Sequence, residues 1–188
     1  MRIELIISGF GGQGILFAGN LIALSAMMEG HQVTYLPVYG PEMRGGTCNC
    51  TVIISQNEIA SPLIYHPSFL IIMNYPSFLK FMPNLKKGGS AIINSDLVKP
   101  KEIEDLQTLQ KKYRLYFIPA TSLAETINAP LLANLCVLGA FYQITKIFKL
   151  KNFKKALRES LGSEKADLFE PNLKAFKLGA KYIKQNFK

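Results

Sequence analysis

Short apolar runs alternate with longer segments of helical periodicity along most of the chain. The apolar runs are bounded by Gly, Pro and Asn and are rich in β-branched residues, which predicts β-strands at residues 3–7, 33–36, 47–55, 69–73, 91–93 and 115–118. Apolar residues at helical spacing predict helices at residues 15–28, 77–82, 101–112 and 131–148. Strands that alternate with helices predict an α/β fold, in which helices cover both faces of a mostly parallel sheet.

The last part of the chain carries most of the positive charge. Residues 146–188 have a net charge of +8, whereas residues 1–145 are nearly neutral at +1. Apolar residues recur at helical spacing in this tail, with lysines between them: Leu173, Phe176, Ala180, Ile183 and Phe187. We therefore expect a single domain over residues 1–188, made of an α/β core (1–145) and a basic helical C-terminal extension (146–188). A near-neutral core argues against a nucleic-acid-binding protein.

The cysteines are odd in number and lack the spacing of a disulfide framework: Cys48, Cys50 and Cys136. We expect free thiols in a reducing cytoplasm. Three cysteines cannot form a four-cysteine zinc or iron–sulfur site, and neither histidine has a companion at metal-ligand spacing, so we expect no metal on this chain. Polar residues interrupt the most apolar stretch, residues 131–148, which favours a buried helix over a membrane span.

The first predicted strand is followed by a glycine loop, Gly9-Phe10-Gly11-Gly12-Gln13-Gly14. Its glycines have the spacing of a dinucleotide-binding fingerprint, in which phosphate oxygens approach amide groups at a helix N-terminus. A nicotinamide or flavin site also needs an acidic residue at the end of the second strand, and none is present there, because Glu29 belongs to the end of the preceding helix. Three interpretations remain open: a phosphate-bearing ligand other than NAD, a purely structural tight turn, and an NAD or FAD site.

A second loop joins the second and third predicted strands and is stiffened by Gly and Pro: Tyr39-Gly40-Pro41-Glu42-Met43-Arg44-Gly45-Gly46-Thr47. It lies at the carboxyl end of a strand, the edge at which open α/β sheets place ligands. The Arg44 guanidinium could bind a carboxylate or phosphate in a bidentate manner. Alternatively, Glu42 and Arg44 pair with each other or with a neighbouring subunit.

Three local features complete the pattern. Asn134 is a polar residue in an apolar helix, and it either bonds to loop backbone or faces the ligand edge. Cys48 and Cys50 share one face of a strand and are expected to be small core residues. The tetrad Ser122-Leu123-Ala124-Glu125 has the spacing of a capping box at a helix N-terminus. No set of residues for a Ser–His–Asp or Cys–His nucleophile is apparent.

Taken together, these motifs resemble the gamma subunit of the 2-oxoacid:acceptor oxidoreductases, over nearly the whole chain. The resemblance is carried by both glycine loops and by Asn134 with Leu138-Gly139-Ala140, in the same order and at the same separations. It implies a Rossmann-like three-layer α/β sandwich with a helical C-terminal tail. The chain has Pro67-Ser68 where the family tends to have Pro-Asp, so an acidic residue that could form hydrogen bonds is missing there.

The resemblance also implies the activity and the partners. Such complexes convert a 2-oxoacid and coenzyme A to acyl-CoA and carbon dioxide, and pass electrons to ferredoxin or flavodoxin. This chain alone would hold no cofactor: thiamine diphosphate, Mg and iron–sulfur clusters belong to alpha, beta and delta subunits, and coenzyme A to a shared site. The isolated chain could form a homodimer. Free-standing gamma subunits of this length are most similar to the 2-oxoglutarate type, although pyruvate and branched-chain enzymes use the same module.

By this resemblance, Glu42, Arg44 and Asn134 are candidates for the active-site entrance, and no residue is assigned a catalytic role. The candidates for contact with coenzyme A or a partner loop come from both glycine loops: Gly9, Gly11, Gly12, Gln13, Gly14, Tyr39, Gly40, Gly45 and Gly46. Two alternatives stay open, a purely structural assembly subunit and an independent NAD-linked reductase.

Overall fold

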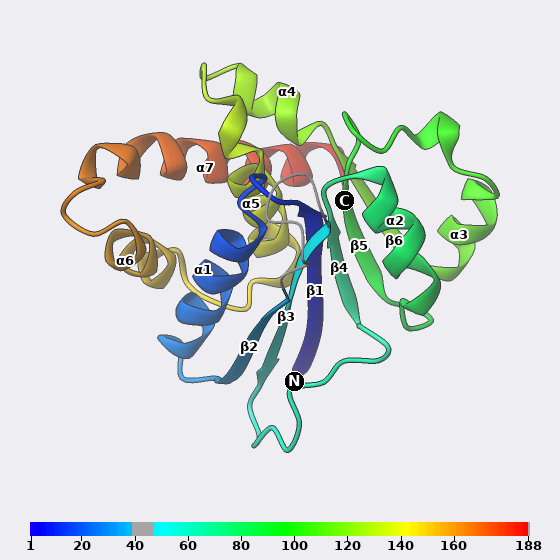
Figure 1. Cartoon of the computed structure of the whole chain (residues 1–188), viewed down its shortest axis with the longest axis horizontal. Coiled ribbons are helices and arrows are strands. Elements are labelled where there is room, and N and C mark those ends of the chain that lie inside the picture. The colour runs from blue at the N-terminus through cyan, green and yellow to red at the C-terminus, as the bar shows by residue number, and fades with distance from the viewer. Residues whose placement is uncertain (39–46, 188) are drawn as a thin grey trace.

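A six-stranded sheet forms the centre of the molecule, and helices cover both of its faces (Figure 1). The computed structural model describes residues 1–38 and 47–187. The strands are β1 (Arg2–Phe10), β2 (Gln32–Val38), β3 (Thr47–Ser55), β4 (Phe69–Ile72), β5 (Ser90–Asn94) and β6 (Arg114–Ile118). The α-helices are α1 (Ile15–Met27), α2 (Tyr75–Phe81), α3 (Leu106–Lys112), α4 (Ala120–Glu125), α5 (Ala133–Thr145), α6 (Leu150–Leu161) and α7 (Phe169–Asn186).

The strand order is β2-β3-β1-β4-β5-β6, and the predicted mostly parallel sheet is confirmed. Strands β1, β4, β5 and β6 run parallel to one another, whereas β3 pairs antiparallel with both β1 and β2. The carboxyl ends of β1, β4, β5 and β6 therefore meet at one edge of the sheet. The glycine loop follows β1 at this edge, which is where ligands bind in open α/β sheets.

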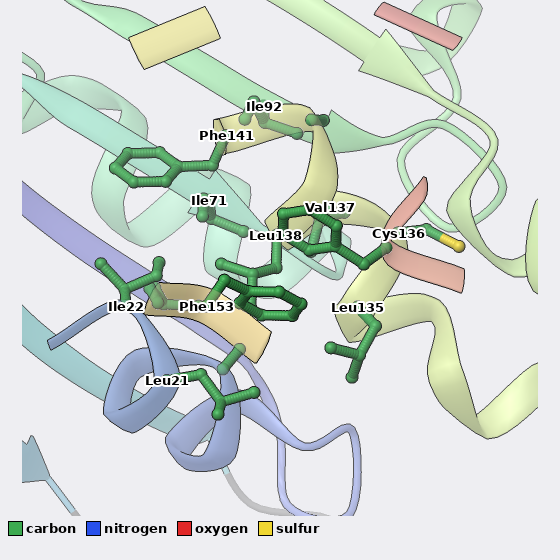
Figure 2. Packing of buried hydrophobic residues seen from close by; sticks show 14 of the residues in the cluster. Leu21, Ile22, Ile71, Ile92, Leu135, Cys136, Val137, Leu138, Phe141 and Phe153 are labelled. Carbon is green, nitrogen blue, oxygen red and sulfur yellow. The ribbon is translucent and has the colours of Figure 1, made fainter. Parts of the chain in front are cut away.

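Alternate residues of the strands point to opposite faces and form two separate apolar cores. Ile7 and Ile71 pack on the face covered by α1 and α5, while Ile6 and Leu70 pack on the face covered by α2. Figure 2 shows the first core, where side chains of α1 and α5 meet the β4 and β5 residues Ile71 and Ile92. Two cores on opposite faces of one sheet make the three-layer arrangement that the sequence predicts.

The basic C-terminal segment belongs to the first core. The rings of Phe153 in α6 and Phe176 in α7 are both buried and stack with centroids 3.9 Å apart. The backbones of α7 and α5 lie in close contact. A Cβ on Gly139 would collide with the backbone of Phe176, and one on Gly179 would collide with that of Cys136. The lysines between the apolar positions of α7 are exposed, as the helical spacing predicts: Lys174, Lys177, Lys181 and Lys184.

An acidic side chain joins α1 to the start of α6. The Glu29 carboxylate accepts hydrogen bonds from the backbone amide of Lys149 at 2.9 Å and from Asn152 Nδ2 at 2.5 Å, and it lies 3.0 Å from Lys149 Nζ. The bond from the Lys149 backbone amide, together with the Lys149 ammonium and the Asn152 amide, lowers the pKa of Glu29. A carboxylate at a helix N-terminus also offsets the positive end of the helix dipole.

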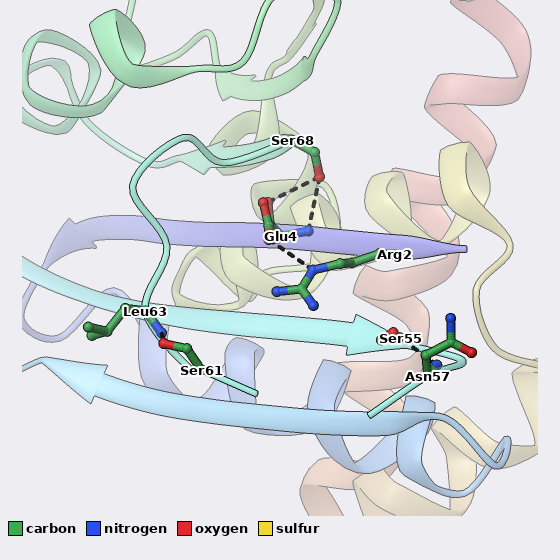
Figure 3. Close-up of polar contacts among 7 residues, drawn as sticks. All are labelled: Arg2, Glu4, Ser55, Asn57, Ser61, Leu63 and Ser68. Atoms are coloured by element: carbon green, nitrogen blue, oxygen red, sulfur yellow. Dashed lines mark hydrogen bonds and ion pairs between the residues drawn. The ribbon is translucent and has the colours of Figure 1, made fainter. Parts of the chain in front are cut away.

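Ser68 forms hydrogen bonds at the position where the family tends to have an acidic residue. Its hydroxyl accepts a hydrogen bond from the Glu4 amide at 2.9 Å and lies 3.3 Å from the Glu4 carbonyl, to which it donates (Figure 3). The Glu4 carboxylate lies 2.9 Å from Arg2 Nε. Ser68 therefore links the start of β4 to β1 without a carboxylate.

Two local predictions are wrong. The capping box at Ser122 does not form: α4 begins at Ala120, and the Ser122 hydroxyl and amide donate to Asp96, each at 2.8 Å. The helix predicted over residues 101–112 is interrupted, because Asp105 adopts a left-handed conformation (φ 52°) and α3 starts only at Leu106. Within the described residues no helix is both long and apolar enough to cross a membrane.

Candidate functional site

The glycine loop makes a closed turn between β1 and α1. The Phe10 amide donates to Gln13 Oε1 at 2.7 Å, and the Gln13 amide donates to the Phe10 carbonyl at 3.2 Å. Gly12 and Gly14 have φ angles of 94° and 69°, a conformation that side chains disfavour. The backbone conformation of the turn therefore explains these two glycines.

Glycine is required at position 9 by close packing and not by the backbone conformation. A Cβ on Gly9 would lie 2.5 Å from Gln13 Oε1, 2.7 Å from Ile15 Cδ1 and 2.9 Å from Met73 Cβ. The interpretation of the loop as a tight, closely packed turn is correct for Gly9. Packing does not account for Gly12, because a Cβ there would meet no atom of the described residues within 4 Å, but its φ of 94° does. Among the described residues, the loop is therefore open on the side of Gly12.

Hydrogen-bond donors lie next to Gly12 in the sequence. Helix α1 starts at Ile15 without a side-chain cap, and the first turn of a helix leaves its amide groups without intrahelical acceptors. The oxygen of the Gln13 side chain is occupied by the Phe10 amide and lies 3.5 Å from Asn74 Nδ2. The Gln13 Nε2 group is therefore the part of this amide left for a further acceptor. Uncapped amides and an amide donor suit an anion such as a phosphate.

Asn134 connects the glycine loop to α5. Its side chain is buried, and Nδ2 donates to the Gly14 carbonyl at 3.1 Å. A Cβ on Gly14 would collide with this amide, so the contact also requires glycine there. Of the two alternatives for Asn134, bonding to loop backbone is the one observed.

A cavity of about 280 Å³ opens beside the glycine loop at the carboxyl edge of the sheet. Its lining comes from the glycine loop, the ends of β4 and β5, and the start of α4 and α5: Gly12, Gln13, Met73, Asn94, Leu97, Thr121, Pro130, Leu131 and Ala133. Two of these side chains extend into solvent, since Leu131 is 84% exposed and Leu97 is 45% exposed. A largely apolar cavity with a few polar side chains and with exposed leucines at its margin is typical of a site that another molecule covers.

Asn94 organises the far side of the cavity. It is fully buried, donates to Thr121 Oγ1 at 3.1 Å and accepts from the Ala120 amide at 3.1 Å. Asn74 plays a similar part at the end of β4, where its Oδ1 accepts from the Ser77 amide at 2.9 Å and caps α2. Sequence reasoning missed both asparagines. The available signal was a polar residue directly after a buried strand.

The second glycine loop lies outside the described residues, and with it Tyr39, Gly40, Glu42, Arg44, Gly45 and Gly46. The strands that flank it are described. In the register of the sheet, Phe10 pairs with Thr47 and Asn49 with Val38. The chain therefore enters and leaves the second loop at the edge that carries the first loop.

The acidic residue that binds the ribose of NAD in a dinucleotide-binding fold has no equivalent position here, because β3 lies beside β1. The antiparallel strand β3 lies between β1 and β2, so the end of β2 is one strand further from the glycine loop than in a dinucleotide-binding fold. Glu29 is bound to Lys149 and Asn152 beyond the opposite end of α1. No described acidic residue takes the clamp's place at the end of β2.

The cysteines lie in the core, away from the cavity lining. Burial raises the pKa of the Cys50 and Cys136 thiols to about 12, and it also raises the pKa of Cys48. Thiols with such pKa values are poor nucleophiles and poor metal ligands. Across the described part of the chain, no three His, Cys, Asp or Glu side chains gather as a metal site would require.

Comparison with known proteins gives consistent relatives. A family model described as "Pyruvate ferredoxin/flavodoxin oxidoreductase" matches residues 4–182. The 2-oxoglutarate synthase subunit KorC of Methanothermobacter thermautotrophicus is 35% identical over 188 residues, which cover 97% of this chain and 96% of the relative.

Solved structures have the same fold. The gamma subunit of a keto/oxoacid ferredoxin oxidoreductase from Geobacter sulfurreducens superimposes with a TM-score of 0.80 at 27% identity, over 96% of this chain and 95% of that one. A 2-oxoglutarate:ferredoxin oxidoreductase from Magnetococcus marinus, solved with 2-oxoglutarate, coenzyme A and succinyl-CoA bound, superimposes with a TM-score of 0.86 at 22% identity. All of this chain is matched in that case, but only 32% of the larger one, and the likeness is one of fold.

Proposed function

Because the chain belongs to the pyruvate ferredoxin/flavodoxin oxidoreductase family, as a gamma-type subunit, we propose that it completes the active site of a 2-oxoglutarate-oxidising complex. In this role the chain covers the entrance of a site held by alpha and beta partners and binds part of coenzyme A. The name of the relative from Methanothermobacter thermautotrophicus supports 2-oxoglutarate as the substrate. Pyruvate and branched-chain 2-oxoacids remain the alternatives.

The observation that carries the proposal is an incomplete site at the carboxyl edge of the sheet. The cavity there measures about 280 Å³, at the lower limit of sites for small ligands, so it accommodates only part of a molecule as large as coenzyme A. Leu131 at its margin is almost fully exposed. A small cavity beside an exposed leucine is explained if a partner subunit supplies the remaining walls.

Within this site the chain binds and orients, and the partners carry out the redox chemistry. The α1 amides and Gln13 Nε2 hold phosphate oxygens of coenzyme A, while Asn134 keeps the loop in place. Arg44 and Glu42 of the second loop face the shared entrance. The partners hold thiamine diphosphate, Mg and iron–sulfur clusters, and the electrons leave to ferredoxin or flavodoxin. Three free cysteines suit a reducing compartment, so we place the complex in the cytoplasm.

The substitution Gln13→Glu tests the site with a minimal change of shape. A carboxylate keeps the oxygen that accepts from the Phe10 amide, but it replaces the Nε2 donor with a negative charge. In the assembled complex we expect the KM for coenzyme A to rise about tenfold, with little change in the KM for 2-oxoglutarate. Gln56→Glu, at the amino end of the sheet, makes the same charge change far from the cavity and should leave both values unaltered.

An unchanged KM for coenzyme A in Gln13→Glu would remove the glycine loop from the coenzyme A site. The exposed Leu131 and Leu97 would then favour the second candidate, a structural assembly subunit whose loops contact only partners. Hydroxyl-radical footprinting separates the two functions. Protection of the cavity residues on addition of coenzyme A supports the proposal, whereas protection that depends only on subunit assembly supports the structural role.

A further inference from the structure

An apolar groove lies on the opposite side of the sheet from α1, between α2 and α3, which run side by side over β4, β5 and β6 (Figure 1). Its volume is about 180 Å³, and six apolar or aromatic residues line it: Phe78, Leu79, Met82, Pro83, Leu109 and Tyr113. Phe78 and Met82 form a buried floor, whereas Leu79 is 57% exposed at the margin. The groove is thus open to solvent and contiguous with the second core.

Exposed cations flank the lining residues of this groove along the chain. They come from α2, from the turn before β5, and from the junction of α3 and β6: Lys80, Lys86, Lys87, Lys111, Lys112 and Arg114. The backbone brings the last two groups together, because the Gly88 amide donates to the Lys112 carbonyl at 3.0 Å and the Arg114 guanidinium donates to the Gly88 carbonyl at 3.3 Å. Among the described residues, none of the six cations has a carboxylate within ion-pair distance.

We infer that this groove is a docking site for an acidic polypeptide, which inserts an apolar side chain between α2 and α3 and places carboxylates against the flanking lysines. An apolar centre with a charged margin is the usual anatomy of a specific interface. The cations without a carboxylate partner select the sign of the occupant, and they would also accelerate its association.

A second copy of this chain does not fit the same surface. The chain has a net charge of +9, and a symmetric contact would place the six cations of one groove opposite the six of its partner. The groove is also separate from the proposed coenzyme A site. The turn at Gly88 precedes β5, and Arg114 begins β6, so the cations lie toward the amino ends of strands whose carboxyl ends carry the cavity. An acidic partner could therefore bind while the cavity is occupied.

Fluorescence anisotropy of the full-length chain with a short acidic peptide tests the inference. The probe carries fluorescein, a central Leu-Phe pair, and only Glu and Asp elsewhere, and a second probe has Ser-Ser in place of Leu-Phe. We expect the double variant Lys86→Glu/Lys112→Glu to bind the first probe at least tenfold more weakly than the unaltered chain. Leu79→Ser should weaken it about threefold without a change in charge.

The matched control is Lys177→Glu/Lys181→Glu on α7, which changes the net charge equally at exposed positions far from the groove. The affinity of this control for the first probe should stay within about twofold of that of the unaltered chain, because screening limits the reach of exposed charges to about 10 Å. Equal weakening in both double variants would show only general attraction to a basic protein and would overturn the inference. Equal affinity for the Leu-Phe and Ser-Ser probes would overturn the apolar insertion, as would a dimer of the chain that Leu79→Ser abolishes.

Discussion

Among the described residues, Asn134 supplies the side-chain hydrogen bond that joins α5 to the glycine loop, and its replacement by alanine would break that bond. The variant loses the 3.1 Å hydrogen bond from Asn134 Nδ2 to the Gly14 carbonyl and the 3.0 Å hydrogen bond that Asn134 Oδ1 accepts from the Leu135 amide. The Gly14 carbonyl also accepts from the Ala18 amide at 3.0 Å, so it does not become wholly unsatisfied in the variant. Asn134 Cβ is kept, and the change is confined to the amide group.

The expected magnitude follows from these contacts. Loss of a buried hydrogen bond whose acceptor keeps another donor costs about 1 kcal/mol. The space left by the amide, next to Gly14, adds to this cost, for a total of about 1–2 kcal/mol in the free energy of unfolding. The functional effect should be larger than the stability suggests, because Gly14 directly precedes α1 and a shift of the loop would move the donors that we propose bind coenzyme A. We expect the KM for coenzyme A to rise several-fold.

Two measurements on paired variants decide the matter. Urea unfolding of the isolated chain gives the stability, and steady-state kinetics of the assembled complex give the KM for coenzyme A. Asn172→Ala is the control, because the buried Asn172 donates a similar bond to the Leu168 carbonyl at 2.8 Å in α7, away from the cavity. If Asn134→Ala and Asn172→Ala both lose stability and have the same KM for coenzyme A, Asn134 has no positioning role at the site.

Two further predictions concern the packing of the C-terminal segment. Gly139→Ala should destabilise the chain by about 3 kcal/mol, since the new methyl group would press into the backbone of α7, whereas Gly162→Ala, with open space around it but a φ of 67°, should cost about 1 kcal/mol; urea unfolding measures both. Because folding lowers the pKa of Glu29, its carboxylate stabilises the fold above the unfolded-state pKa near 4.5, and this stabilisation disappears as the pH falls through the lower folded-state value. Glu29→Gln should therefore be less stable than the unaltered chain at pH 7, by a difference that shrinks as the pH falls below 4.5, and a constant difference across that range would contradict the assignment.

The sequence predicted the layers better than the order of the strands. Buried runs such as residues 69–73 and 91–93 have few alternatives to a strand, because their side chains must leave water on both faces of the sheet. The insertion of β3 between β1 and β2 depends instead on the pairing of β3 with β1, which is distant in sequence and is not specified by local patterns. The capping box failed for a similar reason. Asp96 is distant in sequence, but its carboxylate accepts the hydrogen bond from the Ser122 hydroxyl that the capping box would require.

The candidate site was predicted in part. The glycine loop and Asn134 were found because glycine spacing and a polar residue in an apolar helix are local signals. Asn94 and Thr121 were missed, because only the fold brings the end of β5 beside the start of α4. The tail was predicted as a basic helical extension of a single domain, but the spacing of its apolar residues did not reveal which core they would join. Phe153 and Phe176 complete the core that α1 and α5 begin.

Reconstitution of turnover from separately purified subunits tests most directly whether this chain completes a shared active site. We expect no 2-oxoglutarate oxidation by the chain alone, a low rate from thiamine-bearing partner subunits alone, and a rapid, coenzyme A-dependent rate when they are combined. Full coenzyme A-dependent turnover by the partners without this chain, or turnover by this chain without partners, would contradict the proposed role.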